Sequence, residues 1–427
     1  MSGLSLPARR QVLSPFSPLK NVVPHSLSNG LRVLLKEDHA WPLASIHAWV
    51  HVGSVDEQAS QAGISHIIEH MVFKGTEHTR AADISRWVEA LGGAMNAETS
   101  KEYTHYYIDV PSAGASKAVT LMGELLHRAT FDPKEWDRER PVIQEEIKRR
   151  NDDPESILWD LLNEALFTEE RLRRPVIGSV ETVAALSRDE LWRFYRDFYR
   201  TGGSLVVVAG DFKSRQMLEW LSRAFDGMPP GTGPRRPTFS TDSYQSRHMS
   251  MQRPVQQVYS AMGFPTPPSS HPDHEALDLL AAVLGDGRSS RLVQTLREKK
   301  KIVWSVSTDN YGHEGPGIFS VFAECSPSKQ KLLRPEVERL FGSLRRRPIQ
   351  RDELSRAKNM IHNAWLQSFE TYHQQAASLG LYALDDQLER LENYLPRILA
   401  LEVGDLADTA ERYLQTLPLS SAVIEGP

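Results

Sequence analysis

The run ISHIIEHMV, residues 64–72, places two histidines and a glutamate close together, His66, Glu69 and His70. On a helix, side chains four positions apart share one face, so His66 and His70 could reach one metal ion. Catalytic zinc sites combine three protein ligands, often imidazoles, with one open position, which Glu69 could face. A chance match on an ordinary helix is the alternative. The choice depends on a third ligand elsewhere in the chain.

The segment KEWDRERPVIQEEIKRR, residues 134–150, offers that third ligand. Glu139 and Glu146 are seven positions apart and share a helix face, whereas Glu145 points away. The same mixture of acids and bases would also suit a solvated helix with no metal, which is the default for charged sequence. Pro141 lies between the two glutamates and predicts a helix start or a bend that tilts Glu139 relative to Glu146.

The composition is that of an ordinary globular protein, with 40% hydrophobic and 25% charged residues among 427 positions. A net charge of −5 gives no reason to expect a nucleic acid or an anionic membrane as partner. The single cysteine, Cys325, excludes an internal disulfide and a cysteine-based zinc site. No stretch approaches the roughly 18 apolar residues of a membrane span. The N-terminal segment has no apolar centre of the signal-peptide kind, so we expect a cytoplasmic protein. Its basic residues without acids leave a transit peptide as the alternative.

Residues 227–246 are rich in Pro, Gly, Ser and Thr, and predict a linker between two domains. The segment before the linker and the C-terminal segment each contain an amphipathic helix, a turn and a buried strand rich in Val and Ile. The second half also opens as the first does, with a strand and then a helix. We therefore predict an α+β protein with an internal duplication, in which two α/β domains share one topology and only the first has the histidine pair. The predicted parts are a tail (1–19), a zinc-binding domain (20–228), a linker (229–244) and a homologous domain without metal (245–427).

The chain resembles the pitrilysin/insulysin family of zinc metallopeptidases, in particular the branch with small subunits such as the mitochondrial processing peptidase. The resemblance runs nearly end to end and rests on NGLRVLL, HIIEHMVFKGT, LGGAMNAETSKEYTHYY, ERPVIQEEI, GDGRSSRLVQTLREK and VVVAGD. H-x-x-E-H is the inverted zinc motif. In the family, the third ligand is the second glutamate of a downstream E-x6-E pair. The resemblance therefore implies zinc ligands His66, His70 and Glu146, with Glu139 contacting the ligands rather than the metal.

The same resemblance implies an endopeptidase that depends on Zn2+ and uses Glu69 as its general base. A substrate peptide would add to an edge strand by main-chain pairing, with Asn96 and Ala97 at the cleavage site. Without the resemblance, this segment would be read as an ordinary edge strand. The two domains would form half of a clamshell chamber that encloses peptides or unfolded segments.

A further expectation concerns the partner. Active single-chain members carry an Arg and a Tyr, seven residues apart, that reach the zinc site from the second half and stabilise the oxyanion. Here Arg297 is present, but Trp304 occupies the tyrosine position, and an indole has no phenolic hydroxyl. We therefore expect a heterodimer with a homologous chain that lacks the zinc motif and carries the Arg/Tyr pair. A homodimer that uses Trp304 is the alternative.

Two competing functions belong to other classes. The first is a non-catalytic core subunit of a family complex, whose zinc motif would have decayed; retention of all four motif residues argues against it. The second is a purely structural zinc site, which normally closes with four protein ligands that include cysteine.

Overall fold

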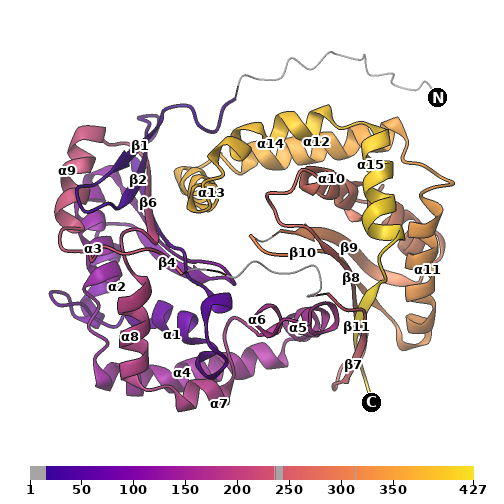
Figure 1. The fold of residues 1–427 in the computed structure, drawn as a ribbon, viewed down its shortest axis with the longest axis horizontal. Coiled ribbons are helices and arrows are strands. Elements are labelled where there is room, and N and C mark those ends of the chain that lie inside the picture. The colour runs from indigo at the N-terminus through magenta and orange to yellow at the C-terminus, as the bar shows by residue number, and fades with distance from the viewer. Residues whose placement is uncertain (1–15, 235, 237–243, 313) are drawn as a thin grey trace.

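Figure 1 shows the chain as two halves side by side, each built on a β-sheet with helices packed against it. The computed structural model describes residues 16–234, 236, 244–312 and 314–427. Much of the predicted tail and of the predicted linker therefore lies outside the described residues, and the exact domain boundaries remain predictions.

The first half carries a six-stranded sheet. In chain order its strands are β1 (Val22–Ser26), β2 (Arg32–Glu37), β3 (Leu43–Val50), β4 (Ala94–Thr99), β5 (Thr104–Pro111) and β6 (Ser204–Gly210). Their order across the sheet is β1-β2-β6-β3-β5-β4. β2 and β6 run parallel, and the other neighbours are antiparallel. Every residue of β6, SLVVVAG, is buried, as expected for a strand covered on both faces.

The second half repeats this plan with five strands. They are β7 (His248–Gln252), β8 (Val258–Thr266), β9 (Val303–Tyr311), β10 (Gly317–Cys325) and β11 (Ser420–Glu425). The order β7-β11-β8-β10-β9 matches β2-β6-β3-β5-β4 strand for strand, including the single parallel pair. The predicted duplication of one α/β topology is therefore confirmed.

The helices follow the same repeat. In the first half they are α1 (Ile64–Val72), α2 (Ala81–Ala90), α3 (Ala115–His127), α4 (Pro133–Asp152), α5 (Pro154–Leu166), α6 (Glu170–Arg173), α7 (Val180–Ala185), α8 (Arg188–Phe198) and α9 (Ser214–Ala224). In the second half they are α10 (His274–Gly285), a π-helical segment (Val293–Lys299), α11 (Gln330–Ser343), α12 (Arg351–Gln367), α13 (Tyr372–Leu384), α14 (Leu388–Ala400) and α15 (Val403–Ala410). α10 follows its strand as α1 does, but it carries no counterpart of the histidine pair.

One helix from each half packs against the sheet of the other half. α5 packs on β8 and β11, whereas α13 packs on β3 and β6 (Figure 1). Ala376 and Leu379 of α13 are buried in one apolar cluster with Trp49 of β3. The contact is close: a Cβ on Gly380 would lie 2.0 Å from Nε1 of Trp49. The two halves are thus tied together by apolar packing, which the sequence patterns did not reveal.

Candidate metal centre

A glycine and a buried glutamate fix the start of α1. Gly63 has φ +94°, and a Cβ there would lie 2.6 Å from the carbonyl oxygen of Ile177, so glycine is required. The carboxylate of Glu57 accepts hydrogen bonds from the backbone N–H groups of Gly63 (2.8 Å) and Ser65 (2.9 Å). Burial raises the pKa of Glu57 to about 7, against the effect of these hydrogen bonds. The buried carboxylate of Glu57 therefore fixes the first turn of the helix that carries His66.

α1 and α4 bring His66, His70 and Glu146 together. Nε2 of His66 lies 3.9 Å from Oε1 of Glu146, and Nε2 of His70 lies 3.4 Å from Oε2 of the same carboxylate. One ligand atom from each of the three residues lies within 4.8 Å of the others. Two imidazoles and a carboxylate with a fourth position open form the donor set of a catalytic zinc site. The three sequence-predicted ligands therefore converge on one point.

A histidine ring must be neutral at the ligating nitrogen to bind a metal ion, so the pKa values of His66 and His70 matter. Burial, with the neighbouring His70 as a second cause, lowers the pKa of His66 to about 3, so this ring is neutral and able to ligate. Burial also acts to lower the pKa of His70, but the hydrogen bond to Glu139 and the charges of Glu69 and Glu146 outweigh it and raise the pKa. Bringing His70 to the neutral, ligating form therefore requires the loss of a proton, which a divalent ion favours.

Glu139 contacts the ring nitrogen of His70 that faces away from Glu146. Its Oε1 is 2.9 Å from Nδ1 of His70, and its Oε2 is 2.6 Å from Nζ of Lys74. By contrast, Nδ1 of His66 is buried and has no hydrogen-bond partner among the described residues. Only one of the two rings is therefore oriented by a carboxylate.

Pro141 does not mark a helix start. α4 begins at Pro133, where Asp132 accepts a hydrogen bond from the backbone N–H of Lys134 and a proline suits the first helical position. Pro141 lies inside this helix, and both Glu139 and Glu146 still reach the residues of α1.

Glu69 lies on the same helix as the two histidines and contacts the edge strand. Oγ1 of Thr99, the last residue of β4, donates a hydrogen bond of 2.5 Å to Oε2 of Glu69. Burial raises the pKa of Glu69, with the Thr99 hydrogen bond opposing the rise. Sequence reasoning missed Thr99, Glu57 and Lys74; Lys74, four residues after His70, was the one that helix spacing could have indicated.

β4, which holds Asn96 and Ala97, is the edge strand of its sheet. It pairs with β5 alone among the described strands, with Asn96 opposite Tyr107 and Ala97 opposite Tyr106. Asn96 is exposed and Ala97 is partly exposed. Both residues therefore lie on an edge strand that ends at Thr99, which contacts Glu69, and their role in substrate binding stays a prediction.

Arg297 and Trp304 stand apart from these residues. Arg297 lies in the π-helical segment, where its ion pair among the described residues is with the adjacent Glu298 at 3.6 Å. Trp304 lies on β9, the edge strand of the second sheet, and its side chain is 55% exposed. No hydrogen bond or ion pair between described residues joins Arg297 to the cluster of His66, His70 and Glu146, so the substrate role implied for it has no contact in support here.

Comparison with known proteins adds the family. Residues 32–180 match the model described as Insulinase (Peptidase family M16), and residues 185–361 match Peptidase M16 inactive domain. A protein of Streptomyces coelicolor, named an uncharacterized zinc protease, is 30% identical over 414 residues, which is 94% of this chain and 89% of that protein. The chain belongs to peptidase family M16. Its three candidate ligands all lie in the first matched segment of this M16 chain.

Other relatives agree with this assignment. An uncharacterized zinc protease of Mycobacterium leprae is 32% identical over 359 residues, covering 83% of this M16 chain and 80% of the relative. The crystal structure of a protease from Helicobacter pylori superposes with a TM-score of 0.89 at 24% identity and covers 96% of this chain and 100% of that one. That likeness shows the fold. Within the part of the M16 chain that the structure describes, no helix is both long and apolar enough to cross a membrane.

Proposed function

We propose that this M16 chain is a zinc-dependent endopeptidase that cleaves peptides or unfolded segments. The observation that carries the proposal is the convergence of His66, His70 and Glu146, with Glu69 between them and the open edge of β4. The donor set suits zinc, and a bound ion would polarise the scissile carbonyl and make a water molecule acidic near neutral pH. The names of the relatives, zinc proteases, support the same metal.

In this proposal Glu69 moves the proton. Its carboxylate takes a proton from the attacking water, whose oxygen bonds to the carbonyl carbon, and later gives that proton to the leaving amine. Burial disfavours the charged carboxylate and so makes Glu69 a better base when ionised. Thr99 fixes one carboxylate oxygen and leaves the other free for the water.

The substrate would bind as an additional strand. β4 offers unpaired main-chain groups along the edge that holds Asn96 and Ala97, and it ends at Thr99 beside Glu69. Main-chain pairing of this kind gives affinity with little dependence on side chains, so a few pockets set the selectivity. An extended peptide or an unfolded segment can pair in this way.

A homologous partner belongs to this proposal. Trp304 has no hydroxyl to assist the oxyanion, and Arg297 is held beside Glu298, so the second half of the chain supplies no complete Arg/Tyr pair. A partner chain without the zinc motif would supply that pair and close a chamber around the substrate. A homodimer remains the alternative arrangement.

Digestion of a peptide library, read by mass spectrometry, tests the proposed function. The zinc-loaded chain is compared with Glu69→Gln and with the matched control Glu145→Gln, each alone and mixed with a homologous chain that lacks the zinc motif. In the mixture, we expect internal cleavage by the wild type and the control, and a loss of about 10²–10⁴-fold in Glu69→Gln. Equal rates in wild type and Glu69→Gln would overturn the role of Glu69. Full activity of the chain alone would overturn the heterodimer.

A further inference from the structure

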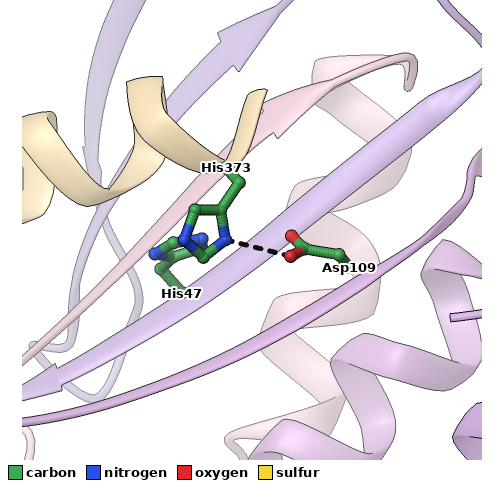
Figure 2. A group of neighbouring side chains, drawn as sticks. All are labelled: His47, Asp109 and His373. Atoms are coloured by element: carbon green, nitrogen blue, oxygen red, sulfur yellow. Dashed lines mark hydrogen bonds and ion pairs between the residues drawn. The ribbon is translucent and has the colours of Figure 1, made fainter. Parts of the chain in front are cut away.

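A second group of side chains that could ligate a metal ion lies on β3, β5 and α13. Figure 2 shows His47 of β3, Asp109 of β5 and His373 of α13 facing one another. Nδ1 of His373 is 2.9 Å from Oδ2 of Asp109, and the rings of His47 and His373 are 4.8 Å apart. One ligand atom from each of the three residues lies within 4.8 Å of the others. The residues come from both halves of the chain.

His47 is also part of a continuous row of hydrogen-bonding groups between two carboxylates. Nδ1 of His105 lies 3.3 Å from Glu98, and Nε2 of His105 lies 2.8 Å from Nδ1 of His47. Nε2 of His47 lies 2.8 Å from Oγ of Ser45, whose hydroxyl donates to Asp109. His47, His105 and Ser45 are all buried.

The groups in this row carry fewer protons than the row has hydrogen bonds. Four links join Glu98, His105, His47, Ser45 and Asp109, and each link needs one proton. Ionised carboxylates only accept, and each neutral imidazole or hydroxyl brings one proton, so the three middle groups bring three. One link therefore pairs two acceptors unless the row gains a cation. Burial, followed by the charges of His105 and His373, lowers the pKa of His47 well below its ordinary value, so an additional proton on this ring is disfavoured.

We propose that His47, Asp109 and His373 bind a divalent transition-metal ion that joins the two halves of the chain. With the ion on Nε2 of His47, Nδ1–H of His47 donates to His105, and Nδ1–H of His105 donates to Glu98. The ion replaces the link between Nε2 of His47 and Ser45, so the Ser45 side chain must turn aside while its hydroxyl donates to Asp109. Each of the three remaining links then holds one proton. Carboxylate–histidine–metal rows of this kind orient ligands in known metal sites. The proposal is independent of the first cluster and of peptidase activity.

The geometry admits such an ion. Ligand atoms of a tetrahedral zinc ion lie about 3.4 Å from one another, given metal–ligand distances of about 2.0–2.2 Å. The ligand atoms are at most 4.8 Å apart, so the widest pair would approach by up to about 1.4 Å, whereas Nδ1 of His373 and Oδ2 of Asp109, now 2.9 Å apart, would separate slightly. The side chains of His373 and Asp109 are 36% and 33% exposed, so they can adjust and the ion can enter from solvent. Imidazole and carboxylate suit Zn2+ and its first-row neighbours, whereas Mg2+ and Ca2+ prefer oxygen ligands alone.

A third group, His51, Glu314 and Asp385, has similar spacing but already holds a cation. The guanidinium of Arg236 lies 2.6 Å from both Nε2 of His51 and Oε2 of Glu314. A metal ion there would have to displace the arginine. We therefore assign the second site to the His47 cluster alone.

Zinc content of the tag-free full-length chain, measured after equilibrium dialysis against Zn2+ alone, tests the proposal. The double substitution His66→Ala/His70→Ala removes the first cluster, and Glu146→Gln serves instead if that variant does not fold. We expect two zinc ions per wild-type chain and one in this background. Adding His373→Gln or Asp109→Asn should remove the remaining ion or weaken its binding at least about 10-fold, while His362→Gln, a histidine on α12, should leave it in place.

A second readout separates a specific site from adventitious binding. Zinc should raise the melting temperature of the background variant, and this rise should disappear with His373→Gln but persist with His362→Gln, because an ion that binds only the folded state stabilises it. The proposal is overturned if the background variant binds no zinc. It is equally overturned if the ion, or the thermal shift, survives both His373→Gln and Asp109→Asn.

Discussion

Nδ1 of His70 lies 2.9 Å from Oε1 of Glu139, and the other oxygen of that carboxylate contacts Lys74 at 2.6 Å. The ring is thus held with Nε2 toward Glu146, the orientation that a metal ligand needs. His66 has no such acceptor among the described residues. Glu139 is therefore the one carboxylate that orients a ligand ring in this cluster, and its removal should be measurable.

Glu139→Gln should weaken zinc binding about 10–100-fold without unfolding the chain, because the amide orients His70 less firmly and adds no negative charge. Competition with a chromophoric chelator measures the affinity. Glu145→Gln is the matched control, because Glu145 is on the same helix, is exposed and pairs with Lys148. Unchanged zinc affinity in Glu139→Gln would show that Glu139 does not support the site.

Thr99→Val should lower kcat about 10-fold and leave KM nearly unchanged, because a hydrogen bond to a charged group contributes about 1.5 kcal/mol and Thr99 only positions Glu69. Thr99→Ser keeps the hydroxyl and should restore most of the rate. Steady-state kinetics on one cleaved peptide measures both constants. If the serine and valine variants have the same kcat, the hydrogen bond from Thr99 does not position Glu69.

Gly63→Ala should destabilise the fold by about 1–3 kcal/mol, since its φ is +94° and the new Cβ would contact the backbone of Ile177. Gly342→Ala is the control: this glycine lies inside α11, and a Cβ there meets nothing within 4 Å. That change should be neutral or stabilise by up to about 1 kcal/mol. Urea unfolding compares the two. A Gly63→Ala variant as stable as wild type would contradict the backbone argument.

Asp278→Asn should change how stability depends on pH. Burial raises the pKa of Asp278 to about 6, although hydrogen bonds from Asn310 and Tyr394 act against the rise. The folded state therefore keeps a proton that the unfolded state releases between about pH 4 and pH 6, so wild-type stability falls as pH rises through this window and stays lower above it. Asparagine remains uncharged and avoids this loss, which is at most about 3 kcal/mol.

Urea unfolding of wild type and Asp278→Asn across that pH range gives the comparison. Glu57 and other raised groups contribute equally to both proteins, so the difference between the two curves isolates Asp278. His274, with Nε2 3.5 Å from Asp278, is also common to both. A difference in the free energy of unfolding that stays constant from about pH 4 to pH 7 would contradict the raised pKa.

Features that depend on residues close in the sequence could be predicted from the sequence alone. The i, i+4 spacing of His66 and His70 and the seven-residue spacing of Glu139 and Glu146 each specify one helix face. Spacing alone left a solvated helix as the default for the two glutamates, and the family resemblance assigned them to the site. The matched helix–turn–strand segments likewise predicted one topology in both halves. Pro141 was the exception, because Asp132 and Pro133 give a stronger start signal than a proline eight residues later.

Features that depend on long-range packing were not predictable in this way. The packing of α5 and α13 on the sheet of the opposite half leaves no signal in the sequence, because an apolar helix face does not indicate which sheet it will cover. Asp109 and His373 are 264 positions apart, and only the docking of α13 brings them together. Thr99 reaches Glu69 across 30 positions for the same reason.

The central claim is that zinc binds between α1 and α4. Anomalous diffraction at the zinc edge, from crystals of the zinc-loaded chain, tests it most directly. We predict a peak within coordination distance of Nε2 of His66, Nε2 of His70 and the carboxylate of Glu146, with Glu69 facing its open side. A zinc-loaded crystal with no peak between these three residues, or with Glu146 turned away from the ion, would contradict the account.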